Sequence, residues 1–159
     1  MNKNKYLGVW FFGLSKSGKT FSSKHLKKKI KNNILVDGDI VRKKISFDLG
    51  YKVSDRKIQL ERLLGISEIS IQSNCFPIVS SVYMTKIISK KIKKNNILLI
   101  KVSRNNKQIK NYSIYKNKNN VVGKNIFYEK FKFFEIYNDG TKNFTIKLNN
   151  LLRSKKLIK

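Results

Sequence analysis

The sequence predicts an α/β fold of three layers, in which helices cover both faces of a five-stranded parallel sheet. Two observations predict it. Short apolar runs alternate along the chain with segments that have the spacing of amphipathic helices, and a glycine-containing turn follows the first apolar run. The chain of 159 residues is long enough for a core of its own, and no internal repeat divides it. We therefore expect a single domain over residues 1–159.

The first predicted strand covers residues 7–12, an apolar run rich in aromatic and β-branched side chains. Residues 13–20 then read Gly-Leu-Ser-Lys-Ser-Gly-Lys-Thr, which matches the phosphate-loop pattern G-x-x-x-x-G-K-[ST]. Residues 19–31 contain no Gly or Pro and are predicted to form a helix. This strand–loop–helix order predicts the fold of the phosphate-loop nucleoside triphosphatases, and it favours a nucleotide site over a turn without a ligand.

The residues of this loop have the chemistry that a polyphosphate needs. Successive backbone N–H groups can point inward as an anion nest, and the helix N-terminus adds partial positive charge. Lys19 can reach the β- and γ-phosphates, and the Thr20 hydroxyl can hold Mg²⁺. We therefore predict a nucleoside triphosphate and Mg²⁺ as cofactors, with Lys19 as a catalytic residue. The predicted nucleotide-binding residues are Gly13, Leu14, Ser15, Lys16, Ser17, Gly18, Lys19 and Thr20.

The second predicted strand is the short apolar run at 34–39, which ends in Asp37-Gly38-Asp39. In an open parallel sheet, ligands bind beyond the carboxyl ends of the strands, so these carboxylates should lie near the phosphate loop. A carboxylate there can bind Mg²⁺ or take the proton from an attacking hydroxyl. The alternative is that Asp39 caps the helix predicted over residues 40–45. We favour Asp39 as the catalytic and metal-binding carboxylate and Asp37 as partly structural.

Arginine is scarce in this lysine-rich chain. Only Arg42, Arg56, Arg62, Arg104 and Arg153 occur. The planar guanidinium of arginine can donate two parallel hydrogen bonds to a phosphate or sulfate, which the lysine ammonium cannot. An arginine in a chain that otherwise uses lysine therefore indicates such bidentate binding, and we expect this role for Arg42, Arg56 and Arg62. For Arg62 the alternative is an ion pair on the helix surface with Glu61 or Glu68.

The rest of the chain continues the alternation of strands and helices. Ser54 is the predicted N-cap of a long helix, and Thr141 is the predicted N-cap of a last helix that runs to about residue 153. Further strands are predicted at 76–82, 97–102 and 131–137, with a helix at 83–94. Residues 103–126, rich in Lys and Asn, are interpreted as a lid over the crevice or as a solvated loop. The tail, 154–159, is expected to fray.

The net charge of +27 attracts anions such as nucleic acid, anionic lipid or polyphosphate metabolites. The basic residues are spread along the whole chain between asparagines, which is typical of codon bias, and no nucleic-acid-binding module is found. We therefore do not expect nucleic acid as the main partner. The single Cys75 allows no internal disulfide. Residues 1–6 lack a cleavage site and no run is long enough to span a membrane, so we expect a cytoplasmic protein.

Several motifs line up, in order and over most of the chain, with one family. They are Gly13-Leu14-Ser15 with Gly18-Lys19-Thr20, Asp37-Gly38-Asp39 with Arg42, Asp48-Leu49-Gly50-Tyr51, Ser54-Asp55-Arg56, and Gly123 with Tyr128-Glu129. This combination resembles the adenylylsulfate kinases. The phosphate loop is common to many families, whereas Asp-Gly-Asp-x-x-Arg followed by Leu-Gly-aromatic and Asp-Arg is much more specific. The resemblance implies transfer of the γ-phosphate of ATP to the 3′-hydroxyl of adenylylsulfate.

The resemblance also implies roles on the acceptor side. Asp39 matches the acidic residue at the acceptor hydroxyl, Arg42 and Arg56 match the substrate-binding arginines, and Tyr51 matches an aromatic that stacks on the acceptor's base. Gln59 stands where the family usually has Asn, and Val121 lies where it has a second stacking Phe. The predicted acceptor-binding residues are therefore Asp37, Arg42, Tyr51, Arg56, Gln59 and Val121.

The departures from the family fall on the acceptor side. After the third strand the family's Ile-Ser-Pro-Tyr-Arg is missing, and the chain reads Val-Tyr-Met-Thr-Lys at 82–86. Val121-Val122-Gly123 is similar to divergent members found in surface-polysaccharide gene sets, which act on other nucleotide-linked molecules such as cytidine diphosphoramidate. Three functions stay open: an adenylylsulfate kinase, a related kinase of another nucleotide-type acceptor, and a basic nucleotide- or nucleic-acid-binding protein without turnover. A homodimer is also left open.

Overall fold

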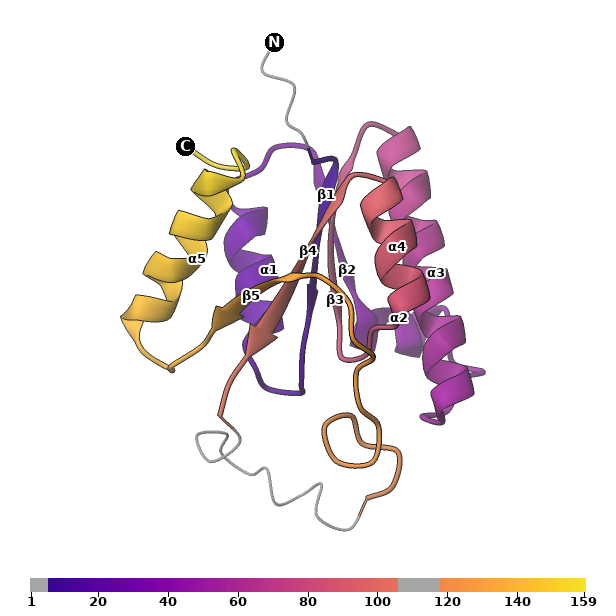
Figure 1. Ribbon diagram of the computed structural model, residues 1–159. Helices are drawn as coiled ribbons and strands as arrows, with labels where there is room; N and C mark the ends of the chain where they lie inside the picture. Colours follow the sequence, from indigo (N-terminus) through magenta and orange to yellow (C-terminus); the bar gives the residue numbers. More distant parts are fainter. Residues whose placement is uncertain (1–5, 106–117) are drawn as a thin grey trace.

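The computed structural model describes residues 6–105 and 118–159 (Figure 1). A sheet of five parallel strands forms its centre, in the order β2-β3-β1-β4-β5. The strands are β1 (Gly8–Phe12), β2 (Asn33–Asp37), β3 (Phe76–Ser81), β4 (Ile97–Ser103) and β5 (Phe134–Tyr137). The helices are α1 (Lys19–Lys27), α2 (Gly38–Lys44), α3 (Val53–Gln72), α4 (Lys86–Lys94) and α5 (Lys142–Ser154). The predicted α/β fold with a five-stranded parallel sheet is confirmed.

Alternation along the central strand builds one core on each face of the sheet. Helices α1 and α5 cover one face of the sheet, and α2, α3 and α4 cover the other (Figure 1). Val9 and Phe11 belong to the core on the first face, and Trp10 and Phe12 belong to the core on the second. All four side chains are fully buried. Because both faces are covered, the strands read as continuous apolar runs. Strand β1, which leads into the phosphate loop, is the central strand of the sheet and lies between β3 and β4.

Two predicted helix starts are wrong. Helix α3 begins at Val53, so Ser54 is not its cap; the Asp55 carboxylate instead accepts a hydrogen bond of 3.2 Å from the N–H of Lys52. Helix α4 begins at Lys86, because the Thr85 hydroxyl caps it by accepting from the N–H of Ile88 at 3.2 Å. The cap predicted at Thr141 is confirmed, since its hydroxyl accepts from the N–H of Asn143 at 3.1 Å.

The other differences concern ends of elements. Helix α1 ends at Lys27, where the Asn33 side-chain amide donates to the Lys27 carbonyl at 3.1 Å. Strand β5 begins at Phe134 and not at Phe131, because residues 131–133 do not pair with β4. The rings of Phe131 and Phe133 pack against Phe12 instead. The predicted fraying of the tail is also wrong, since Leu157 is buried.

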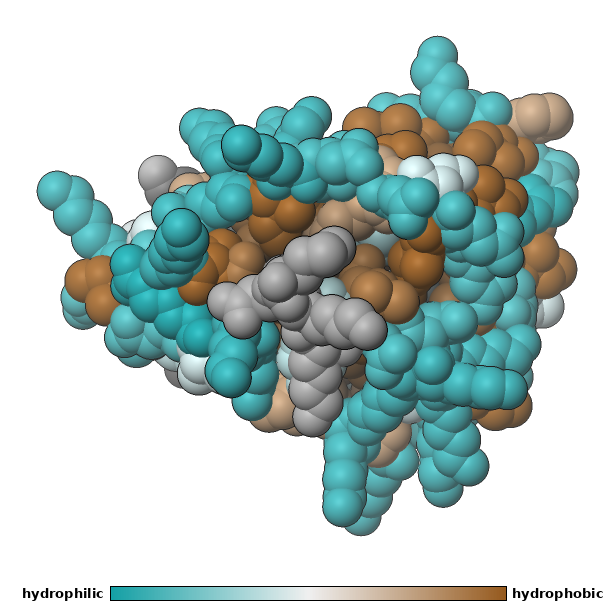
Figure 2. Space-filling view, turned by 90° about the horizontal axis from the view of Figure 1, so that it is seen from above, coloured by the Kyte–Doolittle hydropathy of each residue, from teal (hydrophilic) through white to brown (hydrophobic). Residues whose placement is uncertain are grey.

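Among the described residues, no helix combines the length and the apolar composition that crossing a bilayer requires. Seen from above, at the amino ends of the strands, hydrophilic side chains project around most of the surface and apolar ones show between them (Figure 2). The predicted lid over 103–126 falls partly on residues 106–117, which lie outside the described residues. Its described end, residues 118–126, forms a turn closed by a bridge between Val122 and Ile126.

Candidate active site

The functional side chains converge on one cleft beyond the carboxyl ends of β1, β2 and β3. The cleft has a volume of about 460 Å³. The predicted site residues that line it are Leu14, Ser15, Lys16, Lys19, Thr20, Asp37, Asp39, Arg42, Tyr51, Arg56, Gln59 and Val121. Gly13, Ser17 and Gly18 belong to the same loop but do not line the cleft. The topology of a parallel sheet places these residues together, because the loops after its strands meet at one edge.

The glycines of the phosphate loop occupy positions that no larger residue could fill. Gly18 has φ +114°, and a Cβ there would lie 2.5 Å from the side-chain nitrogen of Asn138. A Cβ on Gly13 would lie 2.1 Å from the carbonyl oxygen of Val102. The loop is therefore closely packed from below, and its two glycines add no side chain that would keep the main chain away from a polyphosphate.

Lys19 is a buried cation at the first turn of α1. Its side chain is only 8% exposed, and its Nζ donates to the carbonyl of Leu14 at 2.7 Å. Burial lowers the pKa of Lys19 from 10.5 to about 8, and the carboxylates of Asp39 and Asp37 oppose this shift. A cation held with little hydration interacts strongly with anions that enter the same space, so Lys19 has the environment that phosphate binding needs.

The two aspartates after β2 have different surroundings. The Asp37 carboxylate caps α2, accepting from the N–H of Asp39 at 3.0 Å and of Ile40 at 3.3 Å, and it also accepts from the Ser80 hydroxyl at 3.0 Å. The alternative that Asp39 caps this helix is therefore wrong. Asp39 is exposed in the first turn of α2, and its carboxylate has no hydrogen-bond partner in the part of the chain that the structure describes. Asp39 is thus available to a metal ion or a hydroxyl.

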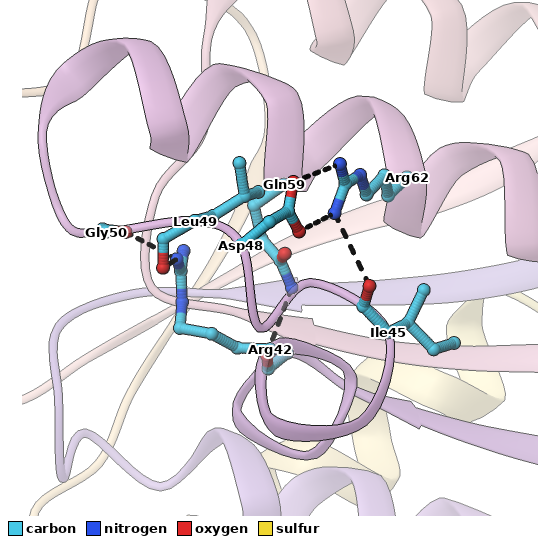
Figure 3. A network of polar contacts seen from close by, with 8 residues as sticks. Arg42, Ile45, Asp48, Leu49, Gly50, Gln59 and Arg62 are labelled. Atoms are coloured by element: carbon cyan, nitrogen blue, oxygen red, sulfur yellow. Dashed lines mark hydrogen bonds and ion pairs between the residues drawn. The ribbon is translucent and has the colours of Figure 1, made fainter.

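Two arginines, Arg42 and Arg56, line the other side of the cleft together with Tyr51. Arg42 donates to the carbonyl of Gly50, as Figure 3 shows, and Arg56 donates through Nε to the carbonyl of Tyr51 at 3.1 Å. The two guanidinium carbons lie 4.9 and 5.6 Å from the centroid of the Tyr51 ring. Tyr51 is still 60% exposed, so part of its ring stays available to a ligand. Arg56 also donates to the carbonyl of Asn120 at 2.7 Å, which ties the end of the lid region to the cleft.

Arg62 does not line the cleft, and the expectation that it binds an anion there is not supported. It forms a two-pronged ion pair with Asp48, with Nη2 to Oδ2 at 2.7 Å (Figure 3). The alternative partners considered for it are also wrong, because Glu61 pairs with Lys91 and Glu68 accepts from Asn95. In contrast, Gln59 is buried in the cleft wall and donates to the carbonyl of Gly38 at 3.1 Å (Figure 3).

Two further residues of this region escaped sequence reasoning. Asn138, at the end of β5, donates to the carbonyl of Ser17 at 2.7 Å and accepts from the N–H of Gly140 at 2.9 Å. In the sequence, Asn138 reads only as part of an Asn-Asp-Gly turn. Tyr83, which follows β3, lines the cleft although nothing in its local pattern distinguishes it from a core aromatic.

A parallel sheet with the phosphate loop after its central strand, a buried lysine in that loop and a carboxylate beside it define a nucleotide-binding protein of the phosphate-loop class. A family model described as adenylylsulphate kinase matches residues 5–147. The chain belongs to the adenylylsulphate kinase family.

Curated relatives agree with this assignment. The adenylyl-sulfate kinase of Buchnera aphidicola subsp. Schizaphis graminum is 31% identical over 96 residues, which are 58% of this chain and 46% of that protein. The adenylyl-sulfate kinase of Staphylococcus haemolyticus is 32% identical over 83 residues, 50% of this chain and 42% of that protein. The chain thus matches slightly less than half the length of these relatives.

Solved structures agree on the fold. The Mycobacterium tuberculosis APS kinase CysC, in complex with AMPPNP and APS, superposes with a TM-score of 0.78 at 17% identity, covering 92% of this chain and 95% of that one. A gluconokinase from Sinorhizobium meliloti has a TM-score of 0.59 at 12% identity, covering 95% of this chain and 93% of its own. The fold is therefore common to kinases of different acceptors, and it alone does not name the acceptor.

Proposed function

We propose that this chain is an ATP-dependent kinase that transfers the γ-phosphate to the 3′-hydroxyl of adenylylsulfate, giving 3′-phosphoadenylylsulfate. One observation carries the proposal. A single cleft holds the buried cation Lys19 and the exposed carboxylate of Asp39 on one side, and Arg42, Arg56 and Tyr51 on the other. This arrangement offers one place for a polyphosphate and another for an acidic nucleotide.

The phosphate loop would orient the donor. The loop backbone from Gly13 to Gly18 would cradle the β- and γ-phosphates, and the Lys19 cation would neutralise charge that grows on the transferring group. Thr20 and Asp39 both line the cleft and offer the oxygen ligands that Mg²⁺ prefers, so these residues fit the ion. When bound, Mg²⁺ would supply further charge stabilisation at the phosphates.

Asp39 would act on the acceptor. Its carboxylate would orient the 3′-hydroxyl and take its proton while the hydroxyl oxygen bonds to the γ-phosphorus. The bond from that phosphorus to the β-phosphate oxygen breaks at the same time, and ADP leaves. Arg42 and Arg56 would hold the acceptor's acidic group, and the exposed part of the Tyr51 ring would contact its base. Asp37 would assist indirectly, since it fixes the start of α2 and so the position of Asp39.

The second candidate is a kinase of another nucleotide-linked acceptor, such as cytidine diphosphoramidate. The observation that favours it is Val121, an aliphatic residue in the cleft wall where the resemblance implies a stacking ring. A smaller base loses less stacking area than adenine at such a wall. The donor side of the cleft would be used in the same way.

The test is release of ADP from MgATP with adenylylsulfate or, separately, with a cytidine diphosphate-type acceptor, with the Lys19→Ala variant as the control. Turnover with adenylylsulfate that is lost in the variant supports the first proposal. Turnover only with the other acceptor supports the second. Failure with both, together with binding to DNA or RNA that weakens steeply with salt, would favour a basic nucleic-acid-binding protein instead. A homodimer and a cytoplasmic location stay predictions.

A further inference from the structure

The segment that follows β3 is fixed in place by side chains from two other parts of the chain, Trp10 and Tyr128, and by Ser81 and Thr85 at its own ends. The Trp10 indole donates to the Ser81 hydroxyl at 2.8 Å, and that hydroxyl donates to the carbonyl of Tyr83 at 2.9 Å. The Tyr128 hydroxyl donates to the carbonyl of Val82 at 2.7 Å. Thr85 then caps α4. The main chain of Tyr83 is therefore held on both sides, and its side chain has a defined position before any ligand binds.

The side chain of Tyr83 combines deep burial with an unused polar group. It is only 6% exposed and packs in the apolar cluster on the α3 and α4 face of the sheet, yet it contributes to the wall of the cleft. With so little of its ring exposed, it cannot serve as a platform for a base. Its hydroxyl has no hydrogen-bond partner among residues 6–105 and 118–159. The hydroxyl is not fully buried, so it is the end of the side chain that faces the cleft, where a ligand oxygen can replace water as its partner.

The charges around Tyr83 indicate the kind of partner. Arg56 lies close enough to interact electrostatically with the phenol, as does Glu129. Burial and the Glu129 carboxylate raise the pKa of Tyr83, whereas Arg56 opposes the shift, so the phenol stays protonated and can donate. Arg56 uses Nε and Nη2 on the carbonyls of Tyr51 and Asn120, and these two bonds leave further N–H groups on its fork.

We propose that Tyr83 is a specificity-determining residue of the acceptor site, whose hydroxyl donates a hydrogen bond to a sulfate or phosphate oxygen of the acceptor beside the guanidinium of Arg56. An anionic oxygen satisfies both groups at once, whereas a neutral acceptor group leaves part of the Arg56 charge uncompensated. The inference rests on the proposed function, since it names the residue that reads the acceptor's acidic group.

Tyr83→Phe removes only the hydroxyl and keeps the ring in the core. We expect the KM for adenylylsulfate to rise about tenfold or more, as for the loss of a hydrogen bond to a charged group, with the KM for ATP changed less than about twofold. The melting temperature should stay the same or rise, because no bond within the protein is lost. Tyr128→Phe is the matched control, since its hydroxyl bonds the Val82 carbonyl and its loss should lower the melting temperature.

The outcomes separate this inference from the proposed function. If the wild type turns over and Tyr83→Phe keeps the same acceptor KM, the role of Tyr83 is overturned and the kinase proposal stands. If the wild type does not turn over adenylylsulfate, the proposed function fails, and anion binding is tested directly. Sodium sulfate is then titrated into the Mg·ADP-saturated protein, with sodium chloride at equal ionic strength as the reference. A smaller sulfate-specific thermal shift in Tyr83→Phe supports the hydroxyl contact, and an equal shift overturns it.

Discussion

The side-chain amide of Asn138 donates a 2.7 Å hydrogen bond to the main-chain carbonyl of Ser17, although the two residues are 121 positions apart. Asn138 is itself buried, and its side-chain oxygen Oδ1 accepts a hydrogen bond from the N–H of Gly140. The end of β5 thus holds the underside of the phosphate loop. Because this contact fixes a main-chain group, it controls the directions of the neighbouring N–H groups that would face the phosphates.

Asn138→Ala should therefore weaken both stability and nucleotide binding. Removing the amide leaves the Ser17 carbonyl without its partner, which costs about 1–3 kcal/mol of unfolding free energy. We expect a lower urea midpoint and a higher Kd for ADP by calorimetry. Asn150→Ala, an exposed substitution on α5, is the control and should change neither. An unchanged ADP affinity in Asn138→Ala would show that the loop keeps its shape unaided.

Gly18→Ala should lower the free energy of unfolding less in the Asn138→Ala background than in the wild type. A Cβ at residue 18 would meet the Asn138 side-chain nitrogen at 2.5 Å, and this clash disappears once that side chain is truncated. The strain of φ +114° persists in both backgrounds, so the rescue is partial. A double-mutant cycle on unfolding free energies measures the coupling. Strictly additive effects would mean that the two side chains do not meet.

Lys19 should leave a signature in the pH dependence of stability. Because its pKa is about 8 in the folded protein and 10.5 in the unfolded chain, the unfolded chain binds more protons between these values. The contribution of Lys19 to stability therefore rises as the pH increases from about 8 towards 10.5. We expect the wild type to gain stability relative to Lys19→Met between about pH 7.5 and 9.5, in nucleotide-free urea titrations. A constant difference between the two proteins would rule out a perturbed lysine.

Substitutions of Arg56 and Arg62 should differ in their effect on the KM for the acceptor. Arg56→Gln removes a charged donor from the cleft and should raise the KM for the acceptor about tenfold or more. Arg62→Gln should leave this KM unchanged, since its guanidinium is paired with Asp48 outside the cleft. Steady-state kinetics with varied acceptor and saturating MgATP compare the two variants. Equal losses in both would argue that the helix surface, and not the cleft, binds the acceptor.

Val121→Phe should improve the use of adenylylsulfate. Val121 lines the cleft where the family resemblance implies a stacking ring, and an aromatic contact is worth about 0.5–1.5 kcal/mol. We expect the KM for adenylylsulfate to fall by about twofold to tenfold, while the KM for ATP stays the same. A higher KM would indicate that the smaller side chain suits a different acceptor.

The place of the phosphate loop beside the Asp-Gly-Asp turn was predictable because both motifs are local. The phosphate-loop residues are contiguous, and the Asp-Gly-Asp turn directly follows an apolar strand. Parallel-sheet geometry then requires these loops to meet at one edge. For the same reason the five strands were found with small errors at their ends, and the cap at Thr141 was predicted from its position before a periodic helix.

Contacts between distant segments could not be predicted. Nothing near Asn138 in the sequence indicates that it bonds Ser17, and Arg62 has two acidic neighbours on its own helix but pairs with Asp48. The start of α3 was missed because the Asp55 carboxylate binds the N–H of Lys52, a competition that residue preferences at a single position do not resolve. Tyr83 was missed because a buried aromatic after a strand reads as core, and only its place in the cleft shows the exposed end.

The contact between β5 and the phosphate loop also bears on how the protein folds during its synthesis. The loop leaves the ribosome before β3 and β4, the two strands that flank β1, and the Asn138 amide is synthesised later still. A nascent chain that has completed its first helix therefore has neither the sheet around β1 nor the support beneath the loop. Because domains fold as units during synthesis, ATP would not stabilise the growing chain until β3, β4 and Asn138 have been translated.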